Sequence, residues 1–115
     1  MKNLFISGIT GKVGKLLSSY ALESNHFKLV GGSCSSDNKF FGKDVGELLE
    51  IDEIGIQISE KMPEDLSVDI IIDFSSPKSS MKILQLAKSK EIPILIGTTG
   101  FSEDDFKEIE IASTQ

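Results

Sequence analysis

Three glycines spaced three residues apart follow directly on a short apolar run near the start of the chain. In the stretch "LFISGITGKVGKLL", residues 4–17, they stand at Gly8, Gly11 and Gly14. The apolar run has the length of a strand, and the residues after the glycines have the periodicity of a helix. The chain therefore opens with a strand, a tight turn and a helix.

A glycine turn between a strand and a helix lets the backbone come close to a bulky anion, because the first N–H groups of the helix point at it. We predict that Gly8 makes the tight turn, that Gly11 leaves room for a pyrophosphate, and that Gly14 lets the helix pack closely on the sheet. Lys12 opposes the helix dipole in the first turn, and a bound anion would resolve that conflict. The glycines alone would also suit a plain tight crossover, but the strand and helix around them favour dinucleotide binding.

Strand and helix patterns alternate along the rest of the chain. One face of the first helix carries apolar side chains, namely Val13, Leu16, Leu17, Tyr20 and Ala21. The patterns predict strands over residues 3–8, 27–33, 54–59, 67–76 and 92–100, and helices over 11–24, 46–50, 76–91 and 103–113. This alternation predicts an α/β fold with a Rossmann-like doubly wound parallel sheet in three layers, α/β/α. With no repeat or linker, residues 1–115 are expected to form one dinucleotide-binding domain.

Charge and composition exclude several classes of partner. Twelve Lys and Arg against eighteen Asp and Glu leave a formal net charge of −6 without a local basic cluster, so we expect no nucleic-acid partner. The single cysteine, Cys34, suits a reducing compartment. We find neither a signal peptide nor an apolar run of membrane-spanning length, and we therefore expect a cytoplasmic protein without a membrane partner.

The end of the second predicted strand bears on which cofactor is bound. In dinucleotide-binding folds this position commonly holds an acid that accepts from the adenine ribose hydroxyls. Here Cys34 and Ser35 occupy it, and the first carboxylate is Asp37. Hydroxyls with Lys39 nearby suit a ribose phosphate, which favours NADPH, with NADH also open. A solvated polar loop without a binding role is an equally simple interpretation.

The fourth and fifth predicted strands also end in polar residues. "DFSSP", residues 73–77, carries Asp73 and Ser75, and "GTTGF", residues 97–101, carries Thr98 and Thr99. Ligands of open parallel sheets gather at this edge, where exposed N–H and hydroxyl groups suit a carboxamide or carboxylate. The same residue types also cap helices.

In their order along the chain, "GITGKVG", "GKDVGEL", "IDFSSP" and "IGTTGF" resemble the amino-terminal, cofactor-binding domain of the bacterial dihydrodipicolinate reductase family. The likeness covers essentially the whole chain. It implies a reductase of the diaminopimelate and lysine pathway that transfers hydride from NADH or NADPH to a cyclic imine-type dicarboxylate. It also implies that the complete enzyme is a homo-oligomer, commonly a tetramer, assembled through a second domain that is absent from this chain.

The resemblance assigns roles by position in these motifs. Phe74 and Ser75 would line the nicotinamide ribose, and Thr99 would lie near both nicotinamide and substrate. Cys34 and Ser35 depart from the acidic and basic pair that many members have at the ribose-reading position, which leaves the cofactor preference open. The resemblance places the pyrophosphate at Gly8, Ile9, Thr10, Gly11, Lys12 and Val13, and the nicotinamide at Gly97, Thr98 and Thr99.

The family's proton-donating His and substrate-binding Lys belong to a motif of the form HHxxKxDAPSG, which does not occur here. The sole histidine, His26, lies just before the second predicted strand. We therefore expect cofactor binding with little turnover, and neither a catalytic residue nor a metal site in this chain. A non-catalytic nucleotide-binding module stays open, as does another Rossmann oxidoreductase such as a short-chain dehydrogenase. The position of the only tyrosine, Tyr20, in the first helix argues against the latter.

Overall fold

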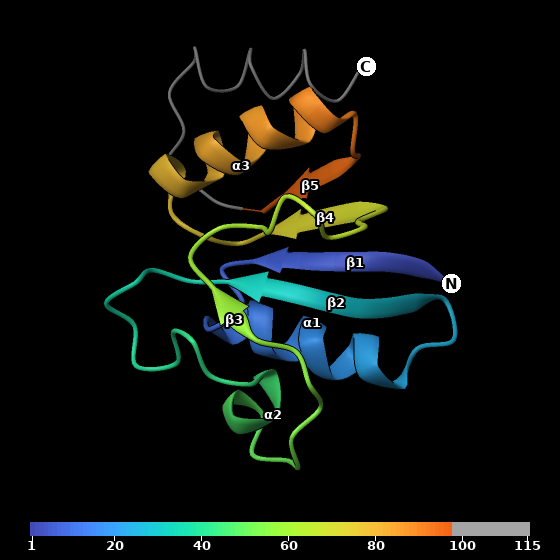
Figure 1. Cartoon of the computed structure of the whole chain (residues 1–115), viewed down its shortest axis with the longest axis vertical. Coiled ribbons are helices and arrows are strands. Elements are labelled where there is room, and N and C mark those ends of the chain that lie inside the picture. The colour runs from blue at the N-terminus through green and yellow to red at the C-terminus, as the bar shows by residue number, and fades with distance from the viewer. Residues whose placement is uncertain (98–115) are drawn as a thin grey trace.

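A computed structural model of the chain describes residues 1–97. The helix predicted over residues 103–113 and the threonines Thr98 and Thr99 lie outside this range. The strands are β1 (Lys2–Ser7), β2 (Phe27–Ser33), β3 (Ile58–Ser59), β4 (Ile70–Asp73) and β5 (Ile94–Ile96), and the helices are α1 (Lys12–Glu23), α2 (Val45–Leu48) and α3 (Pro77–Lys90) (Figure 1).

The strands form one parallel sheet in the order β3-β2-β1-β4-β5, as Figure 1 shows. From β1 the chain runs outward through β2 to β3, then returns to the other side of β1 and continues through β4 to β5. Because the direction of winding reverses there, the carboxyl ends of β1 and β4 form the switch point at which doubly wound sheets bind ligands. The predicted doubly wound α/β fold is confirmed.

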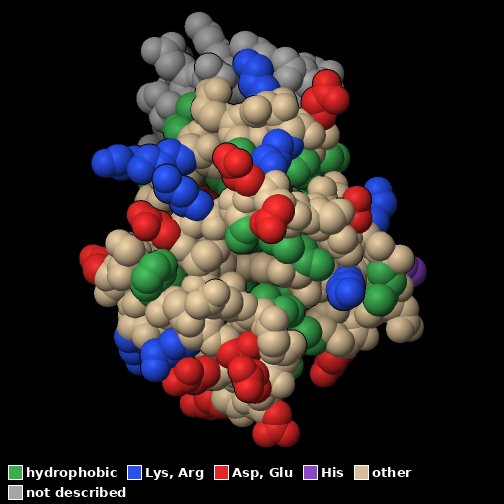
Figure 2. Space-filling view, in the orientation of Figure 1, with side chains coloured by type: hydrophobic (Ala, Val, Ile, Leu, Met, Phe, Trp, Pro, Cys, Tyr) green, Lys and Arg blue, Asp and Glu red, His purple; other side chains and the backbone are tan. Residues whose placement is uncertain are grey.

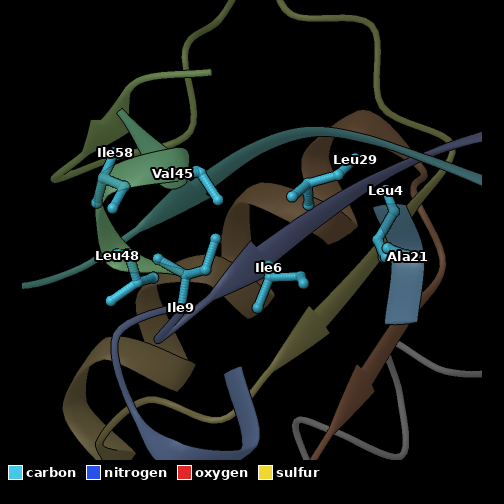
Figure 3. Close-up of a cluster of buried hydrophobic side chains, with 8 residues drawn as sticks. All are labelled: Leu4, Ile6, Ile9, Ala21, Leu29, Val45, Leu48 and Ile58. Atoms are coloured by element: carbon cyan, nitrogen blue, oxygen red, sulfur yellow. The ribbon is translucent and has the colours of Figure 1, made fainter. Parts of the chain in front are cut away.

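Helices cover both faces of the sheet. Leu4 and Ile6 of β1 pack in one core cluster with Ala21 of α1, and eight residues of that cluster are drawn in Figure 3. Phe5 lies between them in sequence and packs in a second cluster with Ile83 of α3. Because successive strand residues point to opposite faces, α1 and α3 lie on opposite sides, which confirms the three layers.

The predicted apolar face of α1 is wrong for Val13, Leu16 and Tyr20, whose side chains are exposed. The helix buries small residues instead, namely Gly14, Ser18 and Ala21. It approaches the turn after β1 so closely that a methyl group on Gly14 would lie 2.6 Å from the Ile9 carbonyl oxygen. Leu17 and Ala21, which belong to the predicted apolar face, do pack in or against the core cluster.

The third strand is much shorter than the predicted range of 54–59, since β3 contains Ile58 and Ser59 alone. The carboxylate of Asp44 accepts hydrogen bonds from the N–H groups of Ile54, at 2.9 Å, and Ile56, at 2.8 Å. These N–H groups face the loop before α2 and do not extend the sheet. β4, Ile70–Asp73, is also shorter than its predicted range of 67–76 and lies within it.

The beginning of α3 follows its sequence signals. Ser76 is the N-cap, and its hydroxyl accepts from the N–H of Ser79 while Pro77 occupies the first helical position. Of the helices described, none has the length and apolar character needed to cross a membrane.

Candidate functional site

The turns that follow β1 and β4 lie side by side at one edge of the sheet, next to Gly97 at the end of β5. The N–H of Phe74, just after β4, donates to the carbonyl of Ser7 at 2.9 Å. The N–H of Gly97, just after β5, donates to the carbonyl of Asp73 at 2.8 Å. The glycine turn and the two stretches predicted to hold the nicotinamide end of a cofactor are therefore brought together as far as Gly97.

Gly8 and Gly11 are glycine for different reasons. Gly8 has a φ of +78°, and a methyl group on it would lie 2.7 Å from backbone atoms of Phe74 and Ser75. Gly11 has a φ of −75°, and the nearest atom to a methyl group there would be 3.7 Å away. Packing within the described residues thus requires glycine at position 8. It does not require glycine at position 11, where the absence of a side chain leaves room for a ligand.

The N-terminus of α1 opens onto this edge without a side-chain cap. Gly11 is the N-cap residue, and no acidic residue lies in the first turn. First-turn N–H groups have no intrahelical acceptor, and together with the helix dipole they favour an anion. Lys12 and Val13, the first two residues of α1, are exposed beside them. This arrangement is suited to a pyrophosphate.

Ile9 has a structural place within the turn. Its side chain is fully buried in the core cluster of Figure 3, and its N–H donates to the Ser33 carbonyl at 3.0 Å. Ile9 therefore anchors the turn to the sheet, with its side chain facing away from solvent.

The loop after β2 is tied to the glycine turn. The side-chain amide of Asn38 donates to the Thr10 hydroxyl oxygen at 3.2 Å, and its carbonyl oxygen accepts from the N–H of Phe40 at 2.9 Å. Cys34, Ser35 and Lys39 belong to the same segment. Sequence reasoning did not single out Asn38, although asparagine in a polar run after a strand is a known turn signal.

A carboxylate lies beside Ser35, one of the two residues at the predicted ribose-reading position. The carboxylate of Asp37 accepts from the Ser35 hydroxyl. Burial, and secondarily the negative charge of Asp37, raise the pKa of the half-buried Cys34 thiol above its ordinary value. The thiol is therefore neutral at neutral pH.

Two lysine side chains lie close to the ring of Phe40 in the loop after β2. The Nζ atoms of Lys39 and Lys15 lie 5.1 Å and 5.8 Å from the centre of the Phe40 ring. Such distances allow cation–π attraction. Lys15 and Phe40 were missed in the sequence, because only the folded loop brings them together.

The turn after β4 is built around a buried acid. Asp73 is fully buried, and its carboxylate accepts from the Ser75 hydroxyl at 2.6 Å, from the Ser75 N–H at 3.3 Å and from the Ser80 hydroxyl. The Phe74 ring lies against Gly97, where a methyl group would be 2.6 Å from the ring carbon Cζ. Phe74 therefore lies beside Gly97, and Ser75 follows it in the turn that contacts Gly8.

Negative charge gathers away from the glycine turn. Figure 2 shows acidic side chains clustered at the end of the molecule that carries α2. Residues 47–53 contribute the exposed acids Glu47, Glu50, Asp52 and Glu53. Within residues 1–97, no group of three or more His, Cys, Asp or Glu side chains is arranged to hold a metal ion.

Known proteins resemble this chain in sequence. A family model described as "Dihydrodipicolinate reductase, N-terminus" matches residues 2–115. The 4-hydroxy-tetrahydrodipicolinate reductase of Buchnera aphidicola subsp. Baizongia pistaciae is 33% identical over 112 residues, which are 96% of this chain and 41% of that protein. The reductase of the same name from Colwellia psychrerythraea is 36% identical over 107 residues, which are 93% of this chain and 40% of that protein. The chain thus spans about two fifths of the length of these curated relatives.

A solved structure shares the fold. Dipicolinate-bound dihydrodipicolinate reductase from Paenisporosarcina sp. TG-14 superposes with a TM-score of 0.72 at 18% sequence identity, covering 97% of this chain and 43% of that one.

Proposed function

The chain belongs to the dihydrodipicolinate reductase family, whose amino-terminal model it matches almost throughout, and from this premise we propose that it binds NAD(P)H across the carboxyl ends of β1, β4 and β5. It is the cofactor-binding domain of a reductase that transfers hydride to a cyclic imine-type dicarboxylate. A second domain of the complete reductase supplies the proton donor and the cationic groups that a dicarboxylate requires.

One observation carries the proposal. The N-terminus of α1 has neither a side-chain cap nor a first-turn acid, and it follows Gly11, where packing within the described residues leaves room. An anion at this point satisfies first-turn N–H groups and offsets the exposed charge of Lys12. The location at the switch point of the sheet matches the place where such folds bind dinucleotides.

The residues predicted at the pyrophosphate and at the nicotinamide have separate roles in this proposal. The backbone of Thr10, Gly11, Lys12 and Val13 holds the pyrophosphate, while Gly8 and Ile9 fix the turn against β4 and the core. Phe74 and Ser75 line the nicotinamide ribose. Gly97, Thr98 and Thr99 lie at the nicotinamide, and Thr99 also contacts the substrate. When bound, the cofactor supplies the hydride, and these residues bind and orient it.

We propose that NADPH binds more tightly than NADH. Lys39 and Lys15 lie beside Phe40, whose ring offers a stacking surface for adenine, and their charges favour a ribose phosphate. Asp37, hydrogen-bonded to Ser35, opposes the phosphate and favours ribose hydroxyls. With two cations against one carboxylate, NADPH is favoured while NADH still binds.

The test is a titration of the purified chain with NADPH and with NADH, followed by the fluorescence of the reduced nicotinamide. The chain contains no tryptophan, so protein emission does not obscure the signal. We expect saturable binding of both cofactors and a lower Kd for NADPH, with no imine reduction by the chain alone. A folded chain that binds neither cofactor at millimolar concentration would contradict the proposal.

A further inference from the structure

We propose that the buried carboxylate of Asp73 is a positioning residue that holds the turn after β4 against both the glycine turn and Gly97, and that it thereby sets the affinity for the cofactor. The inference rests on the proposed function, because it concerns the same edge of the sheet.

Asp73 is the one charged side chain that the described part of the chain buries completely. A buried charge is costly unless hydrogen bonds compensate it. Donors from two elements do so here: the hydroxyl and N–H of Ser75 in the turn, and the hydroxyl of Ser80 within α3. The carboxylate therefore joins the turn to the body of α3.

The turn that Asp73 holds touches both neighbouring turns. Gly8 lies against the backbone of Phe74 and Ser75. A methyl group on Gly8 would be only 2.7 Å from backbone atoms of these two residues. The Phe74 ring covers Gly97. A shift of a few tenths of an ångström in residues 74 and 75 is thus transmitted to the glycine turn and to the end of β5, since close-packed groups do not deform independently.

A carboxylate fits this task better than an amide of the same shape. Its partners at Ser75 and Ser80 are all donors, and a carboxylate offers acceptors on both oxygens. Asparagine would present N–H donors on one side, so one serine hydroxyl would have to turn away. The identity of residue 73 therefore fixes the direction of both serine hydroxyls.

The experiment compares Ser80→Ala and Asp73→Asn with the unchanged 115-residue chain. Ser80 lies in α3 outside the proposed cofactor contacts. Its hydroxyl contacts Asp73 and the Ser75 hydroxyl, 3.3 Å away, so its loss acts on the cofactor through the hydrogen-bond network that Asp73 holds together. Ile83→Val is the matched control, because it removes one methyl group from the same helix and lies in the core cluster of Phe5 and Ile71. Kd for NADPH is measured by nicotinamide fluorescence at a temperature where all proteins are folded, and amide NMR signals of Gly8 and Gly97 are followed without cofactor.

Positioning predicts that Ser80→Ala and Asp73→Asn each raise Kd about tenfold, as expected for the loss of a hydrogen bond to a charged group. Both should shift the amide signals of Gly8 and Gly97. Ile83→Val should lower the unfolding midpoint and leave Kd and these signals unchanged.

If the Asp73→Asn variant does not fold, the Ser80→Ala variant alone tests the positioning role of Asp73. An unchanged Kd and unchanged Gly8 and Gly97 signals in Ser80→Ala would overturn the inference, as would an equal rise of Kd in Ile83→Val. If the unchanged chain binds neither cofactor, the proposed function fails instead, and the NMR comparison still reports whether Asp73 holds the two turns.

Discussion

The backbone of Gly8 lies so close to Phe74 that a methyl group on Gly8 would stand 2.7 Å from the Phe74 carbonyl carbon and oxygen. This contact joins the turn after β1 to the turn after β4 at the switch point of the sheet. Two of the four polypeptide segments proposed to hold the cofactor are therefore positioned by each other.

Gly8→Ala is expected to destabilise the fold through both its φ and this contact. The φ of +78° costs an alanine about 1–2 kcal/mol, and overpacking adds about 1–3 kcal/mol. Gly55→Ala is the matched control, since Gly55 has a φ of +80° with open space around it. Urea unfolding should show a clearly larger loss for Gly8→Ala; equal losses would mean that the close contact with Phe74 is unimportant.

Gly11→Ala should separate binding from stability. Its φ of −75° suits alanine, and the added methyl group meets no atom within 3.4 Å, so the loss of stability should stay within about 1 kcal/mol, the range for an N-cap change. Cofactor affinity should fall at least tenfold, because the methyl group occupies the proposed pyrophosphate site. Unfolding and fluorescence titrations measure the two effects, and an unchanged Kd would argue against a phosphate at Gly11.

The loop after β2 should control the choice between NADPH and NADH. Lys39→Ala should raise Kd for NADPH about fivefold with little change for NADH, whereas Asp37→Asn should lower Kd for NADPH by a similar factor. Lys28→Ala, at an exposed position within β2, serves as the control for a lost surface charge. Parallel titrations at one salt concentration test this, and equal effects on both cofactors would remove these residues from ribose recognition.

Asp44 should make stability depend on pH under acidic conditions. Hydrogen bonds from backbone N–H groups, above all that of Ile54, hold the pKa of Asp44 below its ordinary value. The stabilisation is therefore complete above the unfolded-state pKa of about 3.9 and is lost as the pH falls through the lower folded-state pKa.

The difference in urea midpoint between the unchanged chain and Asp44→Asn should accordingly be large at pH 7 and shrink below about pH 4. Glu53→Gln, an exposed acid before β3, is the control and should leave the midpoint nearly unchanged. A difference that is independent of pH would show that the charge of Asp44 does not matter to the fold.

Local signals made the strand–turn–helix unit and the order of elements predictable, because each depends on a few neighbouring residues. The buried face of α1 was predictable in this way only at Leu17 and Ala21. Its composition follows from the distance between helix and sheet, which Gly14 sets through a contact with the preceding turn.

The loop around Asp37 shows the same limit within the candidate site. Asp37 accepts a hydrogen bond from Ser35 in a loop that Asn38 ties to Thr10, a contact across 28 residues. The short β3 has a similar origin, since Asp44 engages N–H groups that the alternating pattern of residues 54–59 would assign to a strand. The structure of the loop around Asp37 and the length of β3 both depend on hydrogen bonds between residues distant in sequence, which a local sequence pattern does not reveal.

The most direct test of cofactor binding at the carboxyl edge is an amide NMR titration of the isotope-labelled chain with NADPH. The account predicts progressive, saturable shifts for residues 8–13, 34–39 and 74–75 and for Gly97, with the far end of the sheet, near Lys2 and Phe27, unaffected. Saturable shifts confined to other surfaces, or none in a folded sample at millimolar NADPH, would contradict it.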